Sequence, residues 1–293
     1  MITVQLNGGL GNQLFQYAAA KSLALHHKVP LQIDISSFQR ENLPELEVPR
    51  DFELYNFQGI VDNTIFLSEK QNEEIISFLK RTSLSKLLPN HKRKIYSEPF
   101  YHFDKNFFHS KKNILLRGQW QSEKYFLRYK DTFEEILQLK IPLVQQCLPK
   151  AKELYQRNSV SVHIRRADYL RKQIIYEWHG VMEKDYYLKA FEILQAKLGR
   201  FEVYYFTDDI TWVENELIPV QPGEIVSSYT NSHYEDFYLI SQCKHNIIAN
   251  SSFSWWGAWL NRNTEKIVIG PKKWFNKGPK DTFDILPDSW IKV

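Results

Sequence analysis

Cysteine is scarce in this sequence of 293 residues, which contains only Cys147 and Cys243. The two residues lie far apart in the chain, in none of the close spacings that bind zinc or form a redox pair. A disulfide-stabilised scaffold and a cysteine-based metal site are therefore not expected. This sparse use of cysteine fits a reducing compartment, so we expect a cytoplasmic location.

Long apolar runs and a basic leader are also missing from the sequence. No stretch of about 18 apolar residues occurs, so no membrane-spanning helix is predicted. The first residues, 1–6, lack the basic start and the long apolar core of a signal peptide. The formal net charge is only +4 at a pI near 8.8, which favours anionic ligands mildly and does not indicate a nucleic-acid-binding protein.

The sequence does contain two blocks in which apolar strands alternate with helices, a pattern that indicates parallel sheets. The first block predicts strands at 2–6 and 29–35 around a helix at 13–27. The second block predicts strands at 159–164, 202–206, 245–249 and 266–270, with helices near 185–198 and 253–261. We therefore predict an α/β fold with two domains, 1–150 and 151–293, that face a cleft.

The middle of the chain, at about 40–150, has a weaker pattern. Residues 69–79 and 130–139 have helical character, and 113–118 is predicted to be a strand. Basic residues gather at 80–94. We interpret this basic run as a solvated loop, with peripheral contact to a membrane surface or an anionic acceptor as the alternative.

A glycine-rich turn, Gly8-Gly9-Leu10-Gly11-Asn12-Gln13, joins the first predicted strand to the first predicted helix. Its glycine spacing differs from the dinucleotide-binding fingerprint, so we do not interpret it as a Rossmann phosphate site. Gly9 and Gly11 still permit close approach of the backbone to a ligand, while Asn12 and Gln13 carry amides that suit sugar hydroxyls. The alternative is a tight turn in which Asn12 caps the helix.

The strand predicted at 159–164 ends in His163-Ile164-Arg165-Arg166-Ala167-Asp168. Ligands of α/β proteins bind at the carboxyl ends of strands. Two guanidinium groups placed there suit a planar, multiply charged anion such as a diphosphate. The alternative is an ion-pair cluster that closes a surface loop.

A second strand, predicted at 202–206, is followed by Thr207-Asp208-Asp209. Its carboxylates can accept hydrogen bonds from a ribose or from the guanine N1–H and exocyclic amine. The pair differs from the Asp-x-Asp of metal-dependent sugar-nucleotide enzymes, and this segment has too few oxygen ligands for a divalent ion. We expect no metal, with Arg165 and Arg166 in place of the cation; the alternative role for the carboxylates is to cap the next helix.

A third strand end runs into a helix through Asn250-Ser251-Ser252-Phe253-Ser254-Trp255-Trp256. The N–H groups of a helix start, together with the hydroxyls of Ser252 and Ser254, can hold a phosphate. Phe253 is placed to flank a base or a sugar, and the tryptophans are predicted to be helix core. Neither a P-loop nor a nucleophile elbow is found.

Taken in order, these motifs resemble the bacterial α-1,2-fucosyltransferases of glycosyltransferase family 11, which use GDP-fucose. The resemblance spans nearly the whole chain and is loosest at about 40–150. It departs at Ala167, where the family usually has glycine; a positive φ there would strain alanine. The segments that carry it are Gly8 to Ala18, His163 to Asp168, Phe206 to Asp209 and Cys243 to Leu260.

The resemblance implies a GT-B-like fold of two Rossmann-type domains and an inverting reaction that uses neither a metal nor a cofactor. The C-terminal domain would bind the donor, GDP-L-fucose, and the N-terminal half would receive an acceptor, commonly a terminal β-galactoside. Arg165 and Arg166 would clamp the diphosphate. The residues implied to complete the donor site are Ser252, Phe253 and Ser254 beside the phosphates, and Asp208 or Asp209 at the guanine or ribose.

Inversion requires the acceptor hydroxyl to attack opposite the GDP leaving group, and arginines fixed at the growing negative charge supply the largest expected catalytic effect. His163 belongs to the same predicted catalytic motif. Asp168 is the first candidate for the general base, although a carboxylate beside two guanidinium groups is a weak base. Glu177 and His179, in the segment that follows, are the other candidates.

Three other functions compete with this prediction. A GDP-fucose enzyme that makes another linkage would share the donor motifs, because these do not fix the acceptor position. A catalytically silent glycan- or sugar-nucleotide-binding protein is disfavoured by the two arginines, and a nicotinamide-dependent dehydrogenase by the glycine spacing. The natural acceptor and the oligomeric state do not follow from the sequence.

Overall fold

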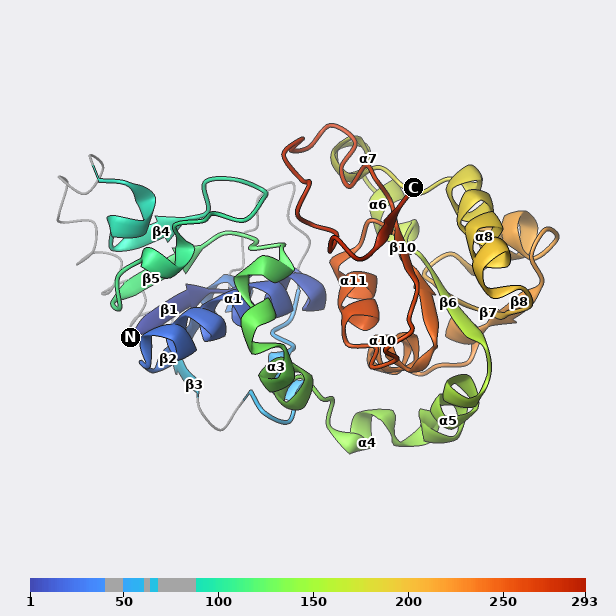
Figure 1. Cartoon of the computed structure of the whole chain (residues 1–293), viewed down its shortest axis with the longest axis horizontal. Coiled ribbons are helices and arrows are strands. Elements are labelled where there is room, and N and C mark those ends of the chain that lie inside the picture. The colour runs from blue at the N-terminus through green and yellow to red at the C-terminus, as the bar shows by residue number, and fades with distance from the viewer. Residues whose placement is uncertain (40–49, 61–63, 68–87) are drawn as a thin grey trace. The chain divides into compact units, whose positions relative to one another are not determined.

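The computed structural model of the chain describes residues 1–39, 50–60, 64–67 and 88–293, which form two compact units (Figure 1). Unit 1 contains Met1–Gln138 and Asp281–Pro287, and unit 2 contains Leu139–Lys280 and Asp288–Val293. The division falls at residue 138, not at the predicted 150, because the helices that follow it pack on a helix of unit 2.

Unit 1 is built on a parallel sheet with the strand order β3-β2-β1-β5-β4. In the described part of unit 1, three strands and two α-helices match predicted elements, with ends that differ by a few residues. The predicted helix at 69–79 lies outside the described residues. The elements are β1 (Ile2–Gln5), α1 (Leu10–His27), β2 (Leu31–Asp34), β3 (Thr64–Leu67), β4 (Ile95–Ser97), β5 (Ile114–Arg117) and α3 (Lys130–Ile136).

Helix α1 packs against β1 and β2. Ala18, Ala19 and Ala20 are consecutive and all fully buried, so the helix is covered by protein on more than one side. The helix ends at Lys28, whose left-handed backbone (φ 55°) lets its N–H bond back to the Leu25 carbonyl at 3.2 Å. The turn at Gly8 and Gly9 is thereby held between β1 and the start of a rigid helix.

Unit 2 contains a parallel sheet with the strand order β11-β10-β9-β6-β7-β8. All the strands and helices that the sequence predicted for this half of the chain are present. The strands are β6 (Ser159–Ile164), β7 (Glu202–Thr207), β8 (Gly223–Ile225), β9 (His245–Ile247), β10 (Val268–Gly270) and β11 (Ile291–Lys292). The helices are α4 (Ile141–Val144), α5 (Leu148–Gln156), α6 (Ala167–Leu170), α7 (Gln173–His179), α8 (Lys184–Leu198), α9 (Ile210–Trp212), α10 (His233–Gln242) and α11 (Ser252–Trp259).

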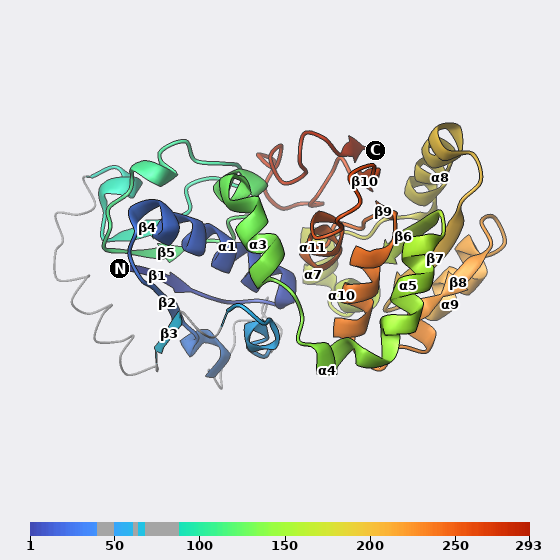
Figure 2. The same ribbon diagram turned by 60° about the horizontal axis from the view of Figure 1, so that its bottom comes forward.

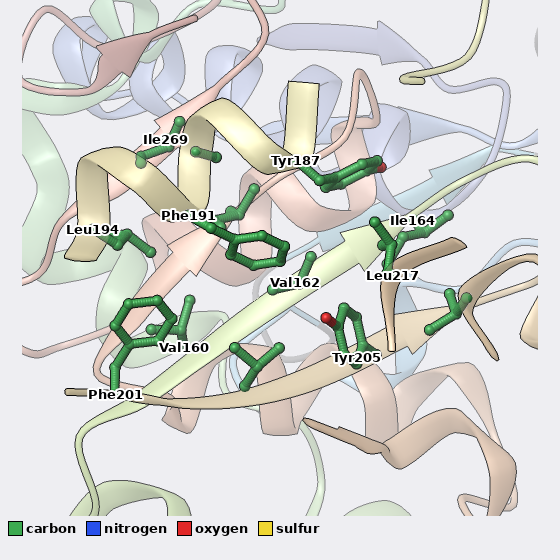
Figure 3. Close-up of a cluster of buried hydrophobic side chains, with 14 residues drawn as sticks. Val160, Val162, Ile164, Tyr187, Phe191, Leu194, Phe201, Tyr205, Leu217 and Ile269 are labelled. Carbon is green, nitrogen blue, oxygen red and sulfur yellow. The ribbon is translucent and has the colours of Figure 1, made fainter. Parts of the chain in front are cut away.

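The core of unit 2 fixes the central strand β6, all six residues of which are buried. On one face, Phe191 of α8 points toward Val162 of β6 (Figure 3). Figure 2 shows α5 and α10 side by side in the same unit, and their contact ties the segment after residue 138 to unit 2. A strand buried on both faces cannot shift its register, so the residues that follow β6 are placed firmly.

Each sheet has one place where the order of strand addition reverses. In unit 1, β1, β2 and β3 follow one another toward one edge, whereas β5 lies on the other side of β1. In unit 2, β6, β7 and β8 run toward one edge, and β9, β10 and β11 run toward the other. Open parallel sheets bind ligands beyond the carboxyl ends of the strands at such switch points. The candidate sites are therefore the ends of β6 and β9 in unit 2 and of β1 and β5 in unit 1.

The predicted fold class, α/β with two Rossmann-type units, is confirmed. Among the described residues, no helix has the length and apolarity needed to cross a membrane.

Candidate active site

Arg165 lies just beyond β6 and is bound by two carboxylates. Its Nη2 contacts Asp168 Oδ2, and its Nη1 lies 3.2 Å from Asp208 Oδ2. The side chain remains 27% exposed, so part of the guanidinium is open to a ligand. Arg165 thus belongs to an ion-pair cluster, the alternative that the sequence left open, and its side chain is still accessible to a ligand.

Arg166 is held more deeply than Arg165. Its guanidinium carbon lies 4.3 Å from the centroid of the Trp212 ring, and its Nη1 is 3.3 Å from Glu183 Oε2. Its Nε is 3.6 Å from Asp209 Oδ2, and the side chain is only 11% exposed. The two adjacent arginines therefore differ in burial. The Arg165 guanidinium is partly exposed beyond the strand end, whereas the Arg166 guanidinium is mostly buried against Trp212.

Asp208 holds the backbone of the arginine loop. Its Oδ1 accepts the N–H of Arg166 at 2.8 Å and the N–H of Ala167 at 3.2 Å. Asp209 caps α9, where its Oδ1 accepts the N–H of Trp212 at 3.1 Å. Both carboxylates have protein partners, so their predicted role in reading guanine or ribose stays a prediction.

His163 is the last side chain but one of β6, and it is almost fully buried. Burial first, and then the charge of Arg165, lower its pKa to about 3, against the opposing effect of Asp208. The imidazole is therefore neutral at physiological pH. Its ring lies 5.6 Å from that of Phe253, which brings the ends of β6 and α11 together.

The segment after β9 supplies the other half of the switch point. Phe253 is half-buried and reaches the site, whereas Ser254 is fully buried and bonds the Ser251 carbonyl of its own turn at 3.3 Å. Ser252 lies at the first position of α11. The tryptophans Trp255, Trp256 and Trp259 are buried in the unit, which confirms their prediction as helix core.

Several buried polar atoms at this switch point have no hydrogen-bond partner within the described residues. Buried polar groups are rarely left in this state, so each one needs an explanation. A polar ligand seated between β6 and β9 would supply the missing partners. The atoms are His163 Nδ1 and Asn250 Oδ1, together with Arg166 Nε and Asp208 Oδ2, which lie in the ion pairs with Asp209 and Arg165 described above.

The two other base candidates lie on α7. Glu177 is bound by Lys277 Nζ at 2.9 Å and by Gln173, and these bonds lower its pKa. His179 stacks on Tyr169 with ring centroids 4.7 Å apart, and burial lowers its pKa to about 4. Its carbonyl accepts a hydrogen bond from Asn250, so His179 lies at the switch point.

The glycine turn of unit 1 lies at the other switch point. Gly9 precedes α1, and Gly11 is buried within its first turn. Asn12 is half-buried, and its Oδ1 accepts a hydrogen bond from Gln121. Gln13 is fully buried, and its amide bonds the Gly8 and Asp51 carbonyls and the Glu53 N–H. Gln13 thus holds the turn, and Asn12 carries the accessible amide.

The model of Glycosyl transferase family 11 matches residues 1–292. The chain belongs to glycosyl transferase family 11. The O-antigen biosynthesis glycosyltransferase WbnK of Escherichia coli is 34% identical, covering 98% of this chain and 99% of its own length. The α-1,2-colitosyltransferase of the same species is 31% identical, covering 100% and 99%.

A solved structure of Arabidopsis thaliana FUT1, a variant in complex with GDP, superposes with a TM-score of 0.50. The match covers 91% of this chain and 69% of that chain at 10% sequence identity, which shows the fold alone. The fold of this family 11 chain is GT-B-like, as the sequence predicted.

Ala167, the departure from the family 11 motif, is tolerated without strain. It is the first residue of α6, and it is not among the residues with positive φ. Alanine is the most favourable residue for a helix, so glycine is not required at this position.

The sequence did not single out Asp236, which supports the family 11 site from α10. Its Oδ2 accepts the Ser227 hydroxyl at 2.5 Å, and the same Ser227 oxygen accepts the Thr207 N–H at 2.9 Å. Thr207 Oγ1 in turn accepts the Asp209 N–H at 2.9 Å. This relay fixes the end of β7, and only the fold brings its parts together.

The remaining site predictions concern a metal and the basic run. Within the described parts of the chain, no group of three or more His, Cys, Asp or Glu side chains could hold a metal ion. Of the basic run 80–94, residues 80–87 lie outside the described residues. Contact of this run with a membrane stays a prediction.

Proposed function

We propose that the chain transfers L-fucose from GDP-β-L-fucose to the 2-hydroxyl of a terminal β-galactoside, with inversion and without a metal ion. The observation that carries the proposal is the switch point of unit 2. Two arginines lie there beside two buried polar atoms that lack partners, His163 Nδ1 and Asn250 Oδ1, in a member of family 11. Such a site suits a nucleoside diphosphate.

Arg165 is the residue proposed to bind the diphosphate directly. As the bond from the fucose carbon to the GDP oxygen breaks, negative charge grows on the leaving diphosphate. A guanidinium that is already fixed by Asp168 and Asp208 meets that charge without reorganising, which lowers the barrier. Arg166, whose guanidinium is stacked on Trp212, adds positive charge to the same site.

The neutral His163 and the ring of Phe253 form one wall of the proposed donor site. With its pKa lowered to about 3, His163 offers a hydrogen bond and carries no positive charge. Phe253 contacts His163 and also Phe237, with ring centroids 5.4 Å apart in the second pair. Aromatic side chains next to the charged arginines suit a ligand that has both a base or sugar face and phosphates.

Asp168 is the first candidate for the general base of the proposed reaction. Its contact with Arg165 also fits a residue that only positions the guanidinium. If Asp168 takes the acceptor proton, Asp168→Asn lowers kcat about 10²- to 10⁴-fold. If kcat is retained and the pH profile is flat, Asp168 only positions Arg165. A pH–rate profile of both enzymes measures this difference.

GDP-colitose is a second candidate donor, because a relative matched along the whole chain is an α-1,2-colitosyltransferase. Colitose is L-fucose without its 3-hydroxyl. A site that hydrogen-bonds this hydroxyl would reject the deoxy sugar strongly, whereas an apolar pocket discriminates only about 10- to 200-fold. The ratio of kcat/KM for the two donors therefore identifies the sugar.

The test is an assay of the purified chain with GDP-fucose and GDP-colitose against lactose, with and without a chelator. We expect GDP release that depends on lactose, that survives the chelator, and that yields an α-1,2-linked product by NMR. A product with another linkage would support the proposed donor and contradict the proposed transfer to the 2-hydroxyl of the acceptor. Binding of GDP-fucose without turnover with any galactoside would indicate a silent binding protein.

A further inference from the structure

We infer that the carboxyl edge between β1 and β5 of unit 1 is a subsite for a neutral sugar, bound by the amides of Asn12, Gln119 and Gln121. The inference rests on the proposed function, because it names the residues that would hold the galactoside acceptor. Neither Gln119 nor Gln121 belongs to a motif that the sequence singled out.

The sheet brings these residues together from distant parts of the chain. Strands β1 and β5 are parallel neighbours, with Val4 paired to Leu116, so they end at the same edge. Gln119 and Gln121 follow β5, and Asn12 follows β1. The Gln121 Nε2 donates to Asn12 Oδ1 at 3.0 Å, which closes the switch point with a pair of amides.

A second set of amides, which includes Gln119, is bonded together at the same edge. Gln16 of α1 is fully buried; its Oε1 accepts the Asn7 N–H at 2.9 Å, and its Nε2 donates to Asn7 Oδ1 at 3.1 Å. Gln119 Nε2 donates to the same Asn7 oxygen at 3.2 Å. These bonds fix the orientation of Gln119, and the bond to Asn12 fixes that of Gln121, before a ligand arrives, which reduces the entropy lost on binding.

One acceptor in this cluster has no partner. Gln121 is only 9% exposed, and its Oε1 makes no hydrogen bond within the described residues. An unpaired buried acceptor is unfavourable, so it marks a position where a donor is expected. A sugar hydroxyl can both donate and accept a hydrogen bond, which matches the oxygen acceptor and the N–H donors of an amide side chain. The three amide side chains are themselves uncharged, which suits a neutral sugar better than a phosphate.

Glu98 is the positioning residue for the loop that carries these amides. Its Oε2 accepts the N–H of Gln119 at 2.7 Å and the N–H of Trp120 at 3.0 Å. Trp120 has a left-handed backbone (φ 55°), and its buried ring packs on Tyr96. The carboxylate and the ring together hold an unfavourable backbone conformation, as is common where a loop is shaped for a ligand.

The variant that tests the subsite is Gln121→Met, which keeps the length of the side chain and removes its polar atoms. We expect the KM for lactose to rise roughly 5- to 10-fold, because one neutral hydrogen-bonding group is lost. The KM for GDP-fucose and the rate of donor hydrolysis without acceptor should stay within about twofold. Asn113→Ala, an exposed amide just before β5 at the opposite end of the sheet, is the matched control and should resemble the wild type.

If Gln121→Met fails to fold, hydrogen exchange of the wild-type enzyme tests the subsite instead. With GDP and lactose present, exchange should slow in peptides that span 7–13 and 118–122, compared with GDP alone. Lactose that slows exchange only elsewhere, or a Gln121→Met enzyme with an unchanged KM for lactose, overturns the inference. If the wild type neither binds GDP nor consumes a GDP-sugar, the proposed function fails instead.

Discussion

The two units of the chain use the same backbone device with different side chains. Both have a parallel sheet with a switch point beside the first strand of the unit. In unit 2 the switch point gathers guanidinium groups and carboxylates, beginning with Arg165 and Asp208. In unit 1 the side chains that converge between β1 and β5 are the amides of Asn12 and Gln121.

The difference suits the two sites to different ligands. Guanidinium groups in a partly buried site favour an anion, and their effect grows as negative charge develops on it. Neutral amides favour hydroxyls and attract an anion only weakly. The contrast therefore supports the proposed diphosphate donor at unit 2 and the proposed neutral sugar at unit 1.

The largest expected effect is that of Arg165→Ala on unit 2. Loss of the group that meets the leaving diphosphate should lower kcat about 10²- to 10³-fold, by analogy with the loss of one oxyanion donor. Steady-state kinetics with GDP-fucose and lactose measure this. Arg157→Ala removes an arginine that pairs with Glu202 at the other end of β6, and it should leave kcat nearly unchanged. Near-normal turnover by Arg165→Ala would contradict the proposal that unit 2 binds the diphosphate through its charged groups.

A second prediction concerns Glu98, a half-buried carboxyl group of unit 1. Burial is the main cause that raises the pKa of Glu98 from 4.5 to about 7, against the N–H groups of Trp120 and Gln119. The folded state therefore keeps a proton that the unfolded state has lost, and the free energy of unfolding falls as pH rises from about 4.5 to 7. The full shift corresponds to up to about 3 kcal/mol.

Glu98→Gln removes this pH dependence, because an amide cannot ionise and its oxygen can still accept the two N–H groups. Denaturant unfolding at pH 5 and pH 8 should show the variant gaining stability over the wild type at the higher pH. Glu135→Gln, at an exposed position of α3, serves as the control and should show no such gain. An equal difference between Glu98→Gln and wild type at both pH values would contradict the raised pKa.

The smallest expected effect is that of Asp209→Ala. Loss of its cap on α9 should lower the free energy of unfolding by about 1 kcal/mol. The KM for GDP-fucose should change little, because the structure engages this carboxylate within the protein. A tenfold rise in that KM without loss of stability would show that Asp209 contacts the nucleoside, as the sequence predicted.

The strands that form the candidate sites could be predicted because long buried runs leave a clear signal. The six buried residues of β6 and the apolar run of β1 are of this kind. The strands β3, β4, β8 and β11 were missed, and the last three of these have only two or three residues, which carry little periodicity. The position of the domain boundary depends on the packing of α5 against α10, which no local pattern records.

The site residues divide in the same way. The arginines were found because their motif follows a strand, which is a local signal. The pairing of Asn12 with Gln121 is not local, because the chain separates these residues and only the β1–β5 register joins them. The roles of Asp208 and Gln13 were also beyond the sequence, since a carboxylate or an amide can serve the protein's own backbone as well as a ligand.

Titration of GDP into three enzymes by calorimetry tests the division between the units most directly. The wild type and Gln121→Met should bind GDP with the same Kd, whereas Arg165→Ala should bind it roughly 10- to 100-fold more weakly, as expected for a lost charged hydrogen bond. An Arg165→Ala enzyme that binds GDP as tightly as the wild type would contradict the assignment of the diphosphate to unit 2.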